Sequence, residues 1–465
     1  MRNSILGCNY SVKKHRFHLL EQKREFWPIV AIGAAAVLAH YAIRAYVNHE
    51  KVEEDVPAEI DLSRKRSSFG IDIGSSSSRV SICELDKKSP YVIENREGRR
   101  STPSIVFMQH GMHRSWNPAK DMDKAEIYVG SSASRYRILK PEKTFTGSSL
   151  LDGSVFPAST AALATVKKSF LYYLLAENLK ITALSKTEGA DSIPSYVSVP
   201  NAFTAAQSSL VVSSCRDAGF NCIASIPDSV AAVLGMIESD LYRPPYNIES
   251  MRHNTVSVID IGGSIIQMSV LLVKSVPNYI PIILTQKTIE NGGFSYDEII
   301  VNYLLAEFSK ANPGICLRND NSAMTRIYDA AELAKIELSG ASTSKVYIPY
   351  ITASQSCPVH LEVEISKTQL SIILMQSMAD IGLSFKEVLA DAKEQLSFGS
   401  ALTFEHDSPS VDFNLTAVLL VGGGARMPLI RATVLEAAGS VPVIVSSQPE
   451  ETIVIGASAY SRIVN

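Results

Sequence analysis

Two short segments of the chain each carry an aspartate followed at once by a glycine turn. The first is the run IDIGSSSS, with its aspartate at Asp72, and the second is IDIGGS, with its aspartate at Asp260. Apolar residues lie on both sides of each turn, which predicts a strand, a tight turn and a second strand. A carboxylate at such a strand end can hold water around Mg²⁺, while turn amides and serine hydroxyls bind phosphate oxygens. The candidate phosphate-binding residues of these turns are Gly74, Ser75, Ser76, Gly262, Gly263 and Ser264.

The two turns lie about half a chain apart. Either one alone is also typical of an ordinary hairpin, because glycine turns are common between strands. Two copies at this spacing predict an internal repeat, with one turn in each of two lobes.

A third glycine turn lies near the C-terminus, in the run AVLLVGGGARMP that ends at Pro428. Its composition predicts a buried strand that breaks into glycines and then into a helix over about residues 429–438. Glycines let the backbone approach a ligand closely, and a helix N-terminus favours an anion. The candidate ligand-binding residues of this turn are Gly422, Gly423, Gly424 and Arg426.

A predicted helix supplies a further set of polar residues on one face. Glu332, Lys335 and Ser339 recur at i, i+3 and i+7, so they line the same side of the helix. Polar side chains that converge in this way are candidates for contacts with a ligand. The alternative is that Glu332 and Lys335 form only a surface ion pair, which contributes little to stability.

The order of these motifs resembles the ATPase domain of the heat-shock protein 70 family. The runs IDIG, VSVPNAFTAAQ, IDIGG, ENGGFSYD, AELAKIELS, VGGGARMP and PEETIVIGAS follow one another from residue 69 to the end of the chain. The resemblance implies an α/β, actin-like fold of two ribonuclease-H-like lobes, residues 69–250 and 251–465, around a cleft that holds ATP or ADP with Mg²⁺. It also implies catalytic roles for Asp72, Asp228 and Asp260, with Asp72 and Asp260 holding Mg²⁺ through water. The same resemblance implies that the polar face of the helix over Glu332, Lys335 and Ser339 contacts ribose and adenine.

Several positions depart from the family pattern where the family performs chemistry. Ile265 and Gln267 stand where the family has a threonine and an aspartate, which removes a hydroxyl and a negative charge. Ser149 aligns with the family's lysine beside the transferred phosphoryl group, where a cation offsets negative charge. Asp228 replaces a glutamate, and Ile336 replaces an arginine that stacks on adenine. We therefore expect ATP binding to persist better than hydrolysis.

The N-terminal part predicts a membrane anchor. Residues 26–43 carry no charge, and as a helix they would span about 27 Å, close to the hydrocarbon thickness of a bilayer. We expect a basic tail over residues 1–25, a transmembrane helix over 26–47 and a charged linker over 48–68. Basic residues before the span and acidic ones after it place the body on the far side from the cytosol, which favours the endoplasmic reticulum lumen. A segment rich in Arg and Ser and poor in acids also suits the mitochondrial inner membrane, and a buried helix or a cleaved targeting peptide is the remaining alternative.

The charge and the cysteine spacing argue against nucleic-acid binding and against a metal site. The 465 residues carry a net charge of −3, which gives no electrostatic reason to expect nucleic acid, and the six cysteines show no spacing typical of a metal site. The chain ends at Asn465 soon after the last motif, so we expect no peptide-binding domain. The sequence therefore favours a membrane-anchored, ATP-binding relative of heat-shock protein 70 that acts in protein folding with co-chaperones or another heat-shock protein 70. The alternatives are an inactive pseudo-ATPase that serves as an interaction platform or exchange partner, and a sugar or acetate kinase on the same fold.

Overall fold

The computed structural model describes residues 67–87, 89–109, 126–146, 168–187, 192–239, 254–273, 280–353, 357–402 and 413–464. They belong to one compact unit, Lys65–Asn465. The predicted tail, the transmembrane helix over 26–47, nearly all of the linker and Ser149 lie outside the described residues. Within these ranges, no helix has both the length and the apolar composition that crossing a bilayer requires.

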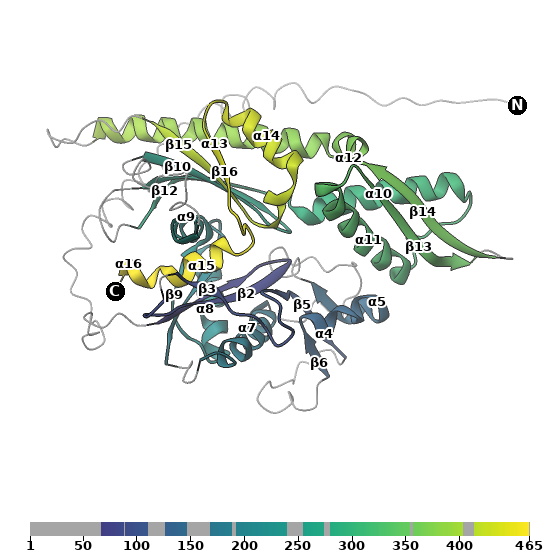
Figure 1. The fold of residues 1–465 in the computed structure, drawn as a ribbon, viewed down its shortest axis with the longest axis horizontal. Helices are drawn as coiled ribbons and strands as arrows, with labels where there is room; N and C mark the ends of the chain where they lie inside the picture. Colours follow the sequence, from purple (N-terminus) through teal and green to yellow (C-terminus); the bar gives the residue numbers. More distant parts are fainter. Residues whose placement is uncertain are drawn as a thin grey trace, which may run out of the picture. The chain divides into compact units, whose positions relative to one another are not determined.

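Two mixed sheets form the centre of this unit (Figure 1). The first has the order β3-β2-β1-β8-β9, with β4 beside β2, and the second has the order β12-β11-β10-β15-β16. In both sheets an antiparallel hairpin supplies a strand that then pairs in parallel with later strands. This common topology confirms the predicted internal repeat and agrees with the expected α/β fold. The strands of the first sheet are β1 (Ser68–Ile73), β2 (Ser77–Cys83), β3 (Tyr91–Val92), β4 (Thr102–Pro103), β8 (Pro194–Val199) and β9 (Asn221–Pro227). Those of the second are β10 (Asn254–Ile261), β11 (Ile266–Val273), β12 (Ile282–Ile289), β15 (Leu415–Val421) and β16 (Val443–Val445).

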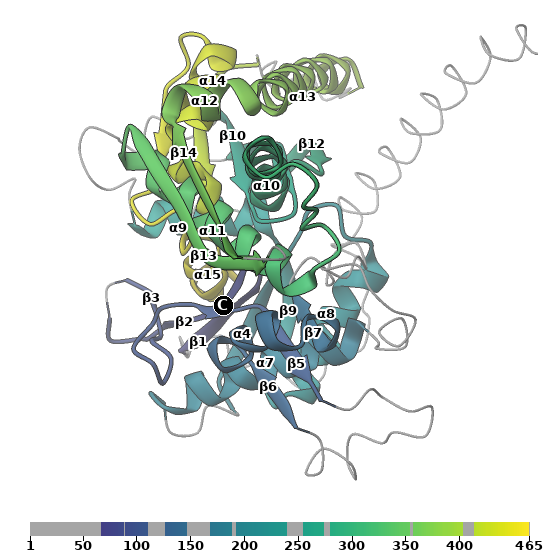
Figure 2. The same ribbon diagram turned by 90° about the vertical axis from the view of Figure 1, so that its right-hand side faces the viewer.

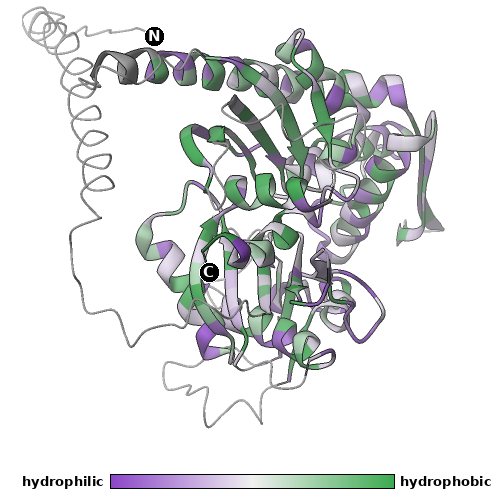
Figure 3. Ribbon diagram, turned by 60° about the vertical axis from the view of Figure 1, so that its left-hand side comes forward, coloured by the Kyte–Doolittle hydropathy of each residue, from purple (hydrophilic) through white to green (hydrophobic). Residues whose placement is uncertain are grey.

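Hydropathy explains why these strands lie inside. The central strands are mainly hydrophobic in Figure 3, and strand β15 is buried over its last five residues, as expected of a parallel strand covered on both faces. Helices α7 (Lys168–Leu184) and α8 (Ala205–Asp217) pack on the first sheet, and α13 (Met375–Leu402) packs on the second sheet and on α14 (Pro428–Ala438). Each sheet thus has its own core of buried aliphatic and aromatic side chains.

Two helices join the sheets. Helices α9 (Asp228–Ser239) and α15 (Thr452–Ala459) pack against each other, and Figure 1 shows them between the sheets. A Cβ atom on Gly456 would lie 1.8 Å from the carbonyl oxygen of Ala231, so only glycine permits this approach of the two helices. Their apolar side chains form a third core with residues of both sheets.

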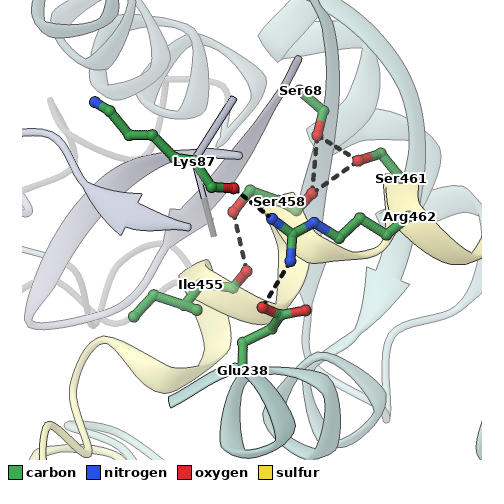
Figure 4. Close-up of polar contacts among 7 residues, drawn as sticks. All are labelled: Ser68, Lys87, Glu238, Ile455, Ser458, Ser461 and Arg462. Atoms are coloured by element: carbon green, nitrogen blue, oxygen red, sulfur yellow. Dashed lines mark hydrogen bonds and ion pairs between the residues drawn. The ribbon is translucent and has the colours of Figure 1, made fainter. Parts of the chain in front are cut away.

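The end of the chain is tied to its first strand. Ser68 donates from its hydroxyl to the carbonyl oxygen of Ser458 at 2.8 Å and bonds the hydroxyl of Ser461 (Figure 4). Arg462, in α16 (Ser461–Val464), donates to Glu238 at 2.8 Å and to the carbonyl oxygen of Lys87. Strand β1 begins at Ser68, one residue before the expected start of the folded part; Ser68 pairs with Cys83 of β2, and its buried hydroxyl bonds the C-terminal helices.

Smaller elements extend each half. A sheet of order β6-β5-β7 carries the short helices α4 (Ser131–Ser134) and α5 (Tyr136–Leu139) and the 3₁₀ turn η3 (Pro141–Lys143). Its strands are β5 (Ile105–Met108), β6 (Ile127–Val129) and β7 (Thr144–Thr146). On the other side, the hairpin β13–β14 packs on α10 and α11, as Figure 2 shows. The elements there are α10 (Gly293–Ala311), α11 (Asn321–Gly340), β13 (Thr343–Ala353), β14 (Pro358–Ser366) and α12 (Lys367–Ile373).

Candidate functional site

The two Asp-glycine turns meet each other. Strands β1 and β2 pair antiparallel across the first turn and β10 and β11 across the second, which confirms both predicted hairpins. The backbone N–H of Ser264 in the second turn donates to the Oγ of Ser75 in the first, at 3.1 Å. The N–H of Phe294, at the start of α10, donates to the carbonyl oxygen of Gly263 at 2.7 Å. The candidate phosphate-binding turns thus form one continuous surface, with α10 beside it.

The three predicted catalytic aspartates also converge. Asp72 lies near the end of β1, Asp228 is the first residue of α9, and Asp260 lies near the end of β10. Gln267 on β11 is the cross-strand neighbour of Asp260, and its Nε2 donates to Asp228 Oδ2 at 2.9 Å and to Asp260 Oδ2 at 3.2 Å. Its Oε1 accepts the backbone N–H of Asn201 at 2.7 Å. A side chain that the resemblance identified as a lost acid therefore connects two of the acids that remain.

Burial and mutual repulsion disturb the ionisation of this group. Burial, and then the charge of Asp72, raises the pKa of Asp260 to about 7. Burial raises the pKa of Asp228 well above its ordinary value, and the charges of Asp260 and Asp72 add to the effect. Burial also raises the pKa of Asp72, although the nearby Arg79 opposes the shift. Hydrogen-bond donors or positive charge at this point would stabilise the ionised acids.

The fit of a divalent cation to these acids is poor. Within the described ranges, no three acidic, histidine or cysteine side chains lie close enough to hold a metal ion directly. Asp228 Oδ2 and Asp260 Oδ2 already accept the Gln267 amide, whereas the hydrogen bond of Asp72 within the described residues is a 3.5 Å contact with the Ser198 hydroxyl. Oxygen ligands suit Mg²⁺, but an amide N–H between them does not. The predicted roles of Asp72 and Asp260 as metal ligands stay predictions of the resemblance.

The third glycine turn packs against the second aspartate. After β15, Gly422 has a φ of +80°, and its N–H donates to the carbonyl oxygen of Pro449 at 2.8 Å. A Cβ atom there would lie 2.4 Å from Asp260 Oδ1. The helix predicted from residue 429 is confirmed as α14, but a 3₁₀ turn that the sequence analysis missed, η6 (Gly423–Arg426), precedes it. Arg426 forms an ion pair with Glu450, in which Nη2 lies 2.8 Å from Oε2.

Helix α11 confirms the shared face of Glu332, Lys335 and Ser339. The ion-pair partner of Lys335 is Asp297 on α10, at 2.7 Å, and not Glu332 as in the alternative interpretation. Lys335 also donates to the carbonyl oxygen of Gly293, and Ser339 bonds back to its own helix. Lys335 therefore holds α11 against α10, and Ile336 next to it is exposed.

A pocket of about 790 Å³ opens beside the joined turns. Four predicted ligand residues line it: Ser75, Ser76, Ser264 and Glu332. The hydroxyl of Ser264 is buried at the wall of the pocket and has no hydrogen-bond partner within the described residues. The remaining predicted residues do not line the pocket: Asp72, Gly74, Asp228, Asp260, Gly262, Gly263, Lys335, Ser339, Gly422, Gly423, Gly424 and Arg426.

Other residues line this pocket that the sequence analysis did not single out. They include Arg99, Arg137, Phe203, Phe294 and Tyr328. Phe203 and Phe294 lie within the runs VPNAF and ENGGF, which gave a signal for them. The two arginines lie in none of the motifs. Arg99 lies in a loop and Arg137 in the short helix α5, so only the tertiary structure brings them to the pocket. A volume of this size with a few convergent polar groups is typical of a small-molecule site.

Comparison with known proteins is consistent with this geometry. The family model described as "Hsp70 protein" matches residues 68–170 and 175–465. The chain is also similar to "Chaperone protein DnaK" of Buchnera aphidicola subsp. Schizaphis graminum (strain Sg), with 30% identity over 424 residues. That alignment covers 85% of this chain and 59% of the relative. The chain therefore spans less than two thirds of the length of this relative.

Proposed function

The chain belongs to the Hsp70 family, and from that premise we propose that it is an ATP-binding protein of chaperone-assisted folding whose hydrolysis is weak or partner-dependent. The observation that carries the proposal is the contact between Ser264 and Ser75 at the wall of the 790 Å³ pocket. It brings two turns rich in N–H and hydroxyl donors to one place, which suits a chain of phosphates. The unpartnered hydroxyl of Ser264 adds a donor there.

Calorimetry of the full chain with ATP and ADP tests the proposal. We expect saturable binding, and we expect Ser264→Ala to weaken it several-fold through the loss of one hydroxyl donor. Ser342→Ala is a matched control, because Ser342 is exposed and lies beyond the end of α11, outside the pocket lining. Absence of nucleotide binding in the wild-type chain would refute the proposal.

A second candidate is a pseudo-ATPase that serves as an interaction platform or as an exchange partner for a true chaperone. The Gln267 amide between Asp228 and Asp260 favours it, because it removes one negative charge and occupies the oxygens of two predicted catalytic acids. Single-turnover hydrolysis separates the two candidates: binding with slow turnover supports the first, and no turnover supports the second. The double variant Ile265→Thr, Gln267→Asp should raise turnover, and an unchanged rate would contradict our explanation of the deficit.

Co-chaperones or another heat-shock protein 70 are the partners that we propose. For the platform function, adding the chain to a purified heat-shock protein 70 should change its rate of ADP release. An unchanged rate across a range of concentrations would exclude the role of exchange partner.

Membrane attachment through residues 26–47 is a separate proposal, and the uncharged run over residues 26–43 supports it. We propose that the body lies in the endoplasmic reticulum lumen, with the mitochondrial inner membrane as the alternative. Alkaline carbonate should leave the full chain in the membrane pellet and release a chain that lacks residues 1–47. Protease protection of the body in sealed microsomes, compared with mitochondria, then tests the compartment.

A further inference from the structure

The side chain of Gln267 is fixed by three hydrogen bonds in a buried place. It is 3% exposed, both N–H groups of its amide meet carboxylates, and its oxygen meets the N–H of Asn201. Reversing the amide would turn its oxygen toward Asp228 and Asp260 and its donors toward the donor of Asn201. Because the backbone N–H of Asn201 can only donate, that bond would become a repulsion, so the network favours the observed orientation.

Asn201 is itself held by several hydrogen bonds, so the Gln267 amide cannot move away easily. Asn201 Nδ2 donates to the Ser269 hydroxyl at 2.7 Å, and Asn201 Oδ1 accepts the N–H of Ser229 at 3.1 Å. Its carbonyl oxygen accepts Nε2 of Gln286 at 3.1 Å. Gln267 therefore belongs to a network that joins the β8–α8 loop, the start of α9 and three strands of the second sheet, β10, β11 and β12.

The amide lies where the repulsion between two buried acids must be relieved. Two neighbouring buried carboxylates repel, and protonation, a cation or a pair of donors relieves that repulsion. In this chain the two amide donors occupy that position. A metal ion could bind between the acids only after both hydrogen bonds broke and the buried amide moved away.

We propose that Gln267 replaces a divalent cation at this site and that the chain binds nucleotide with little dependence on Mg²⁺. This inference rests on the proposed nucleotide binding and concerns its metal requirement. The phosphates would be held by the turn amides and hydroxyls around Ser75 and Ser264, which need no metal to act as donors. The prediction applies to binding of ATP and of ADP alike.

The experiment measures the affinity of the full chain for ADP in excess EDTA and in excess Mg²⁺. We expect the two dissociation constants to agree within about threefold. Gln267 already bonds Asp228 and Asp260, and the donors around Ser75 and Ser264 need no Mg²⁺ to bind phosphate. A tenfold or greater preference for Mg²⁺ in the wild-type chain would overturn the inference while nucleotide binding stands. No ADP binding in either buffer would refute the proposed function and the inference together.

Two variants test whether Gln267 itself determines the Mg²⁺ dependence of binding. Gln267→Asp places a third carboxylate beside two others, so binding should become at least tenfold tighter with Mg²⁺ than in EDTA. Gln395→Asp is the matched control: it makes the same change on helix α13, where the side chain is exposed and lies outside both this network and the pocket lining. It should keep the wild-type ratio. If Gln267→Asp does not fold, as judged by circular dichroism, the wild-type comparison still decides the question.

Discussion

The backbone N–H of Ser264 lies 3.1 Å from the Oγ of Ser75, although 189 residues separate them in the chain. Each residue belongs to the turn of one repeat, so this hydrogen bond joins the two halves at the wall of the pocket. The same hydroxyl would contact a phosphate group in the proposed complex. One side chain therefore links the closure of the site with ligand binding.

Ser75→Ala should lower both stability and nucleotide affinity. The variant leaves the N–H of Ser264 without its acceptor, which we expect to cost about 1 kcal/mol of unfolding free energy. Ser76→Ala is the comparison, because Ser76 also lines the pocket but its side chain is exposed. That variant should weaken binding without lowering the melting temperature. Equal melting temperatures for the two variants would contradict the role that we assign to Ser75.

Gly422→Ala should be far more damaging than Gly423→Ala. Gly422 has a φ of +80°, and an added Cβ would lie 2.4 Å from Asp260 Oδ1. We expect a loss of about 2 kcal/mol or more, from backbone strain and displacement of the aspartate. At Gly423 the nearest atom to an added Cβ is Cγ of Glu450, at 3.8 Å, so the loss should stay below about 1 kcal/mol. Urea denaturation of both variants measures the difference, and similar losses would show that the turn tolerates a side chain.

The ligand-free protein should become less stable as the pH rises from 5 to 7.5, because the buried Asp297 ionises in this interval. Burial raises the pKa of Asp297 from 3.8 to about 6, against the opposing effect of Lys335. A carboxyl group whose pKa is raised on folding stabilises the folded state below its unfolded pKa, and this contribution is lost as the pH rises through the folded pKa. Over this interval the loss from Asp297 is about 1 kcal/mol.

Asp297→Asn isolates this contribution. The variant should lose about 1 kcal/mol less than the wild type between pH 5 and pH 7.5, although it is less stable at pH 7.5 because Lys335 loses its ion-pair partner. Asp260, whose pKa is raised to about 7, adds a slope of the same sign in both proteins and therefore cancels in the comparison. Denaturation curves at the two pH values give the result. Parallel slopes for both proteins would rule out a raised pKa at Asp297.

Arg137→Ala should accelerate nucleotide release with little effect on stability. The guanidinium of Arg137 on α5 lies 2.7 Å from Asp329 on α11, and Arg137 lines the pocket from one half while Tyr328 lines it from the other. The ion pair is partly exposed, so its contribution to unfolding should be under about 1 kcal/mol. Stopped-flow release of a fluorescent ADP should be several-fold faster.

A remote ion pair provides the control for Arg137. Lys345 and Glu362 lie 2.6 Å apart on the β13–β14 hairpin, outside the pocket lining. Lys345→Ala removes an ion pair of similar length and should leave the release rate unchanged. If the double variant Arg137→Ala, Asp329→Ala releases nucleotide faster than either single variant, by the sum of their separate effects, the ion pair does not control release.

Much of the fold was predictable from local patterns. The aspartate-glycine runs, with apolar residues on both sides, predicted two hairpins, and their spacing predicted the repeat that the strand orders confirm. The helical spacing of Glu332, Lys335 and Ser339 placed them correctly on one face of α11. These features follow from backbone geometry and from the period of side chains along helices and strands, which depend on neighbouring residues.

Long-range contacts were not predictable in this way. The sequence alone identified Gln267 as a missing acid, but only the folded chain brings it between Asp228 and Asp260 and fixes its amide through Asn201. The ion pair of Lys335 with Asp297, and of Arg137 with Asp329, likewise joins residues from different elements. The sequence by itself determined which turns and helices form and which residues they carry. The tertiary structure decided which polar groups meet, because partners for buried charges and hydrogen bonds are selected by packing between distant segments.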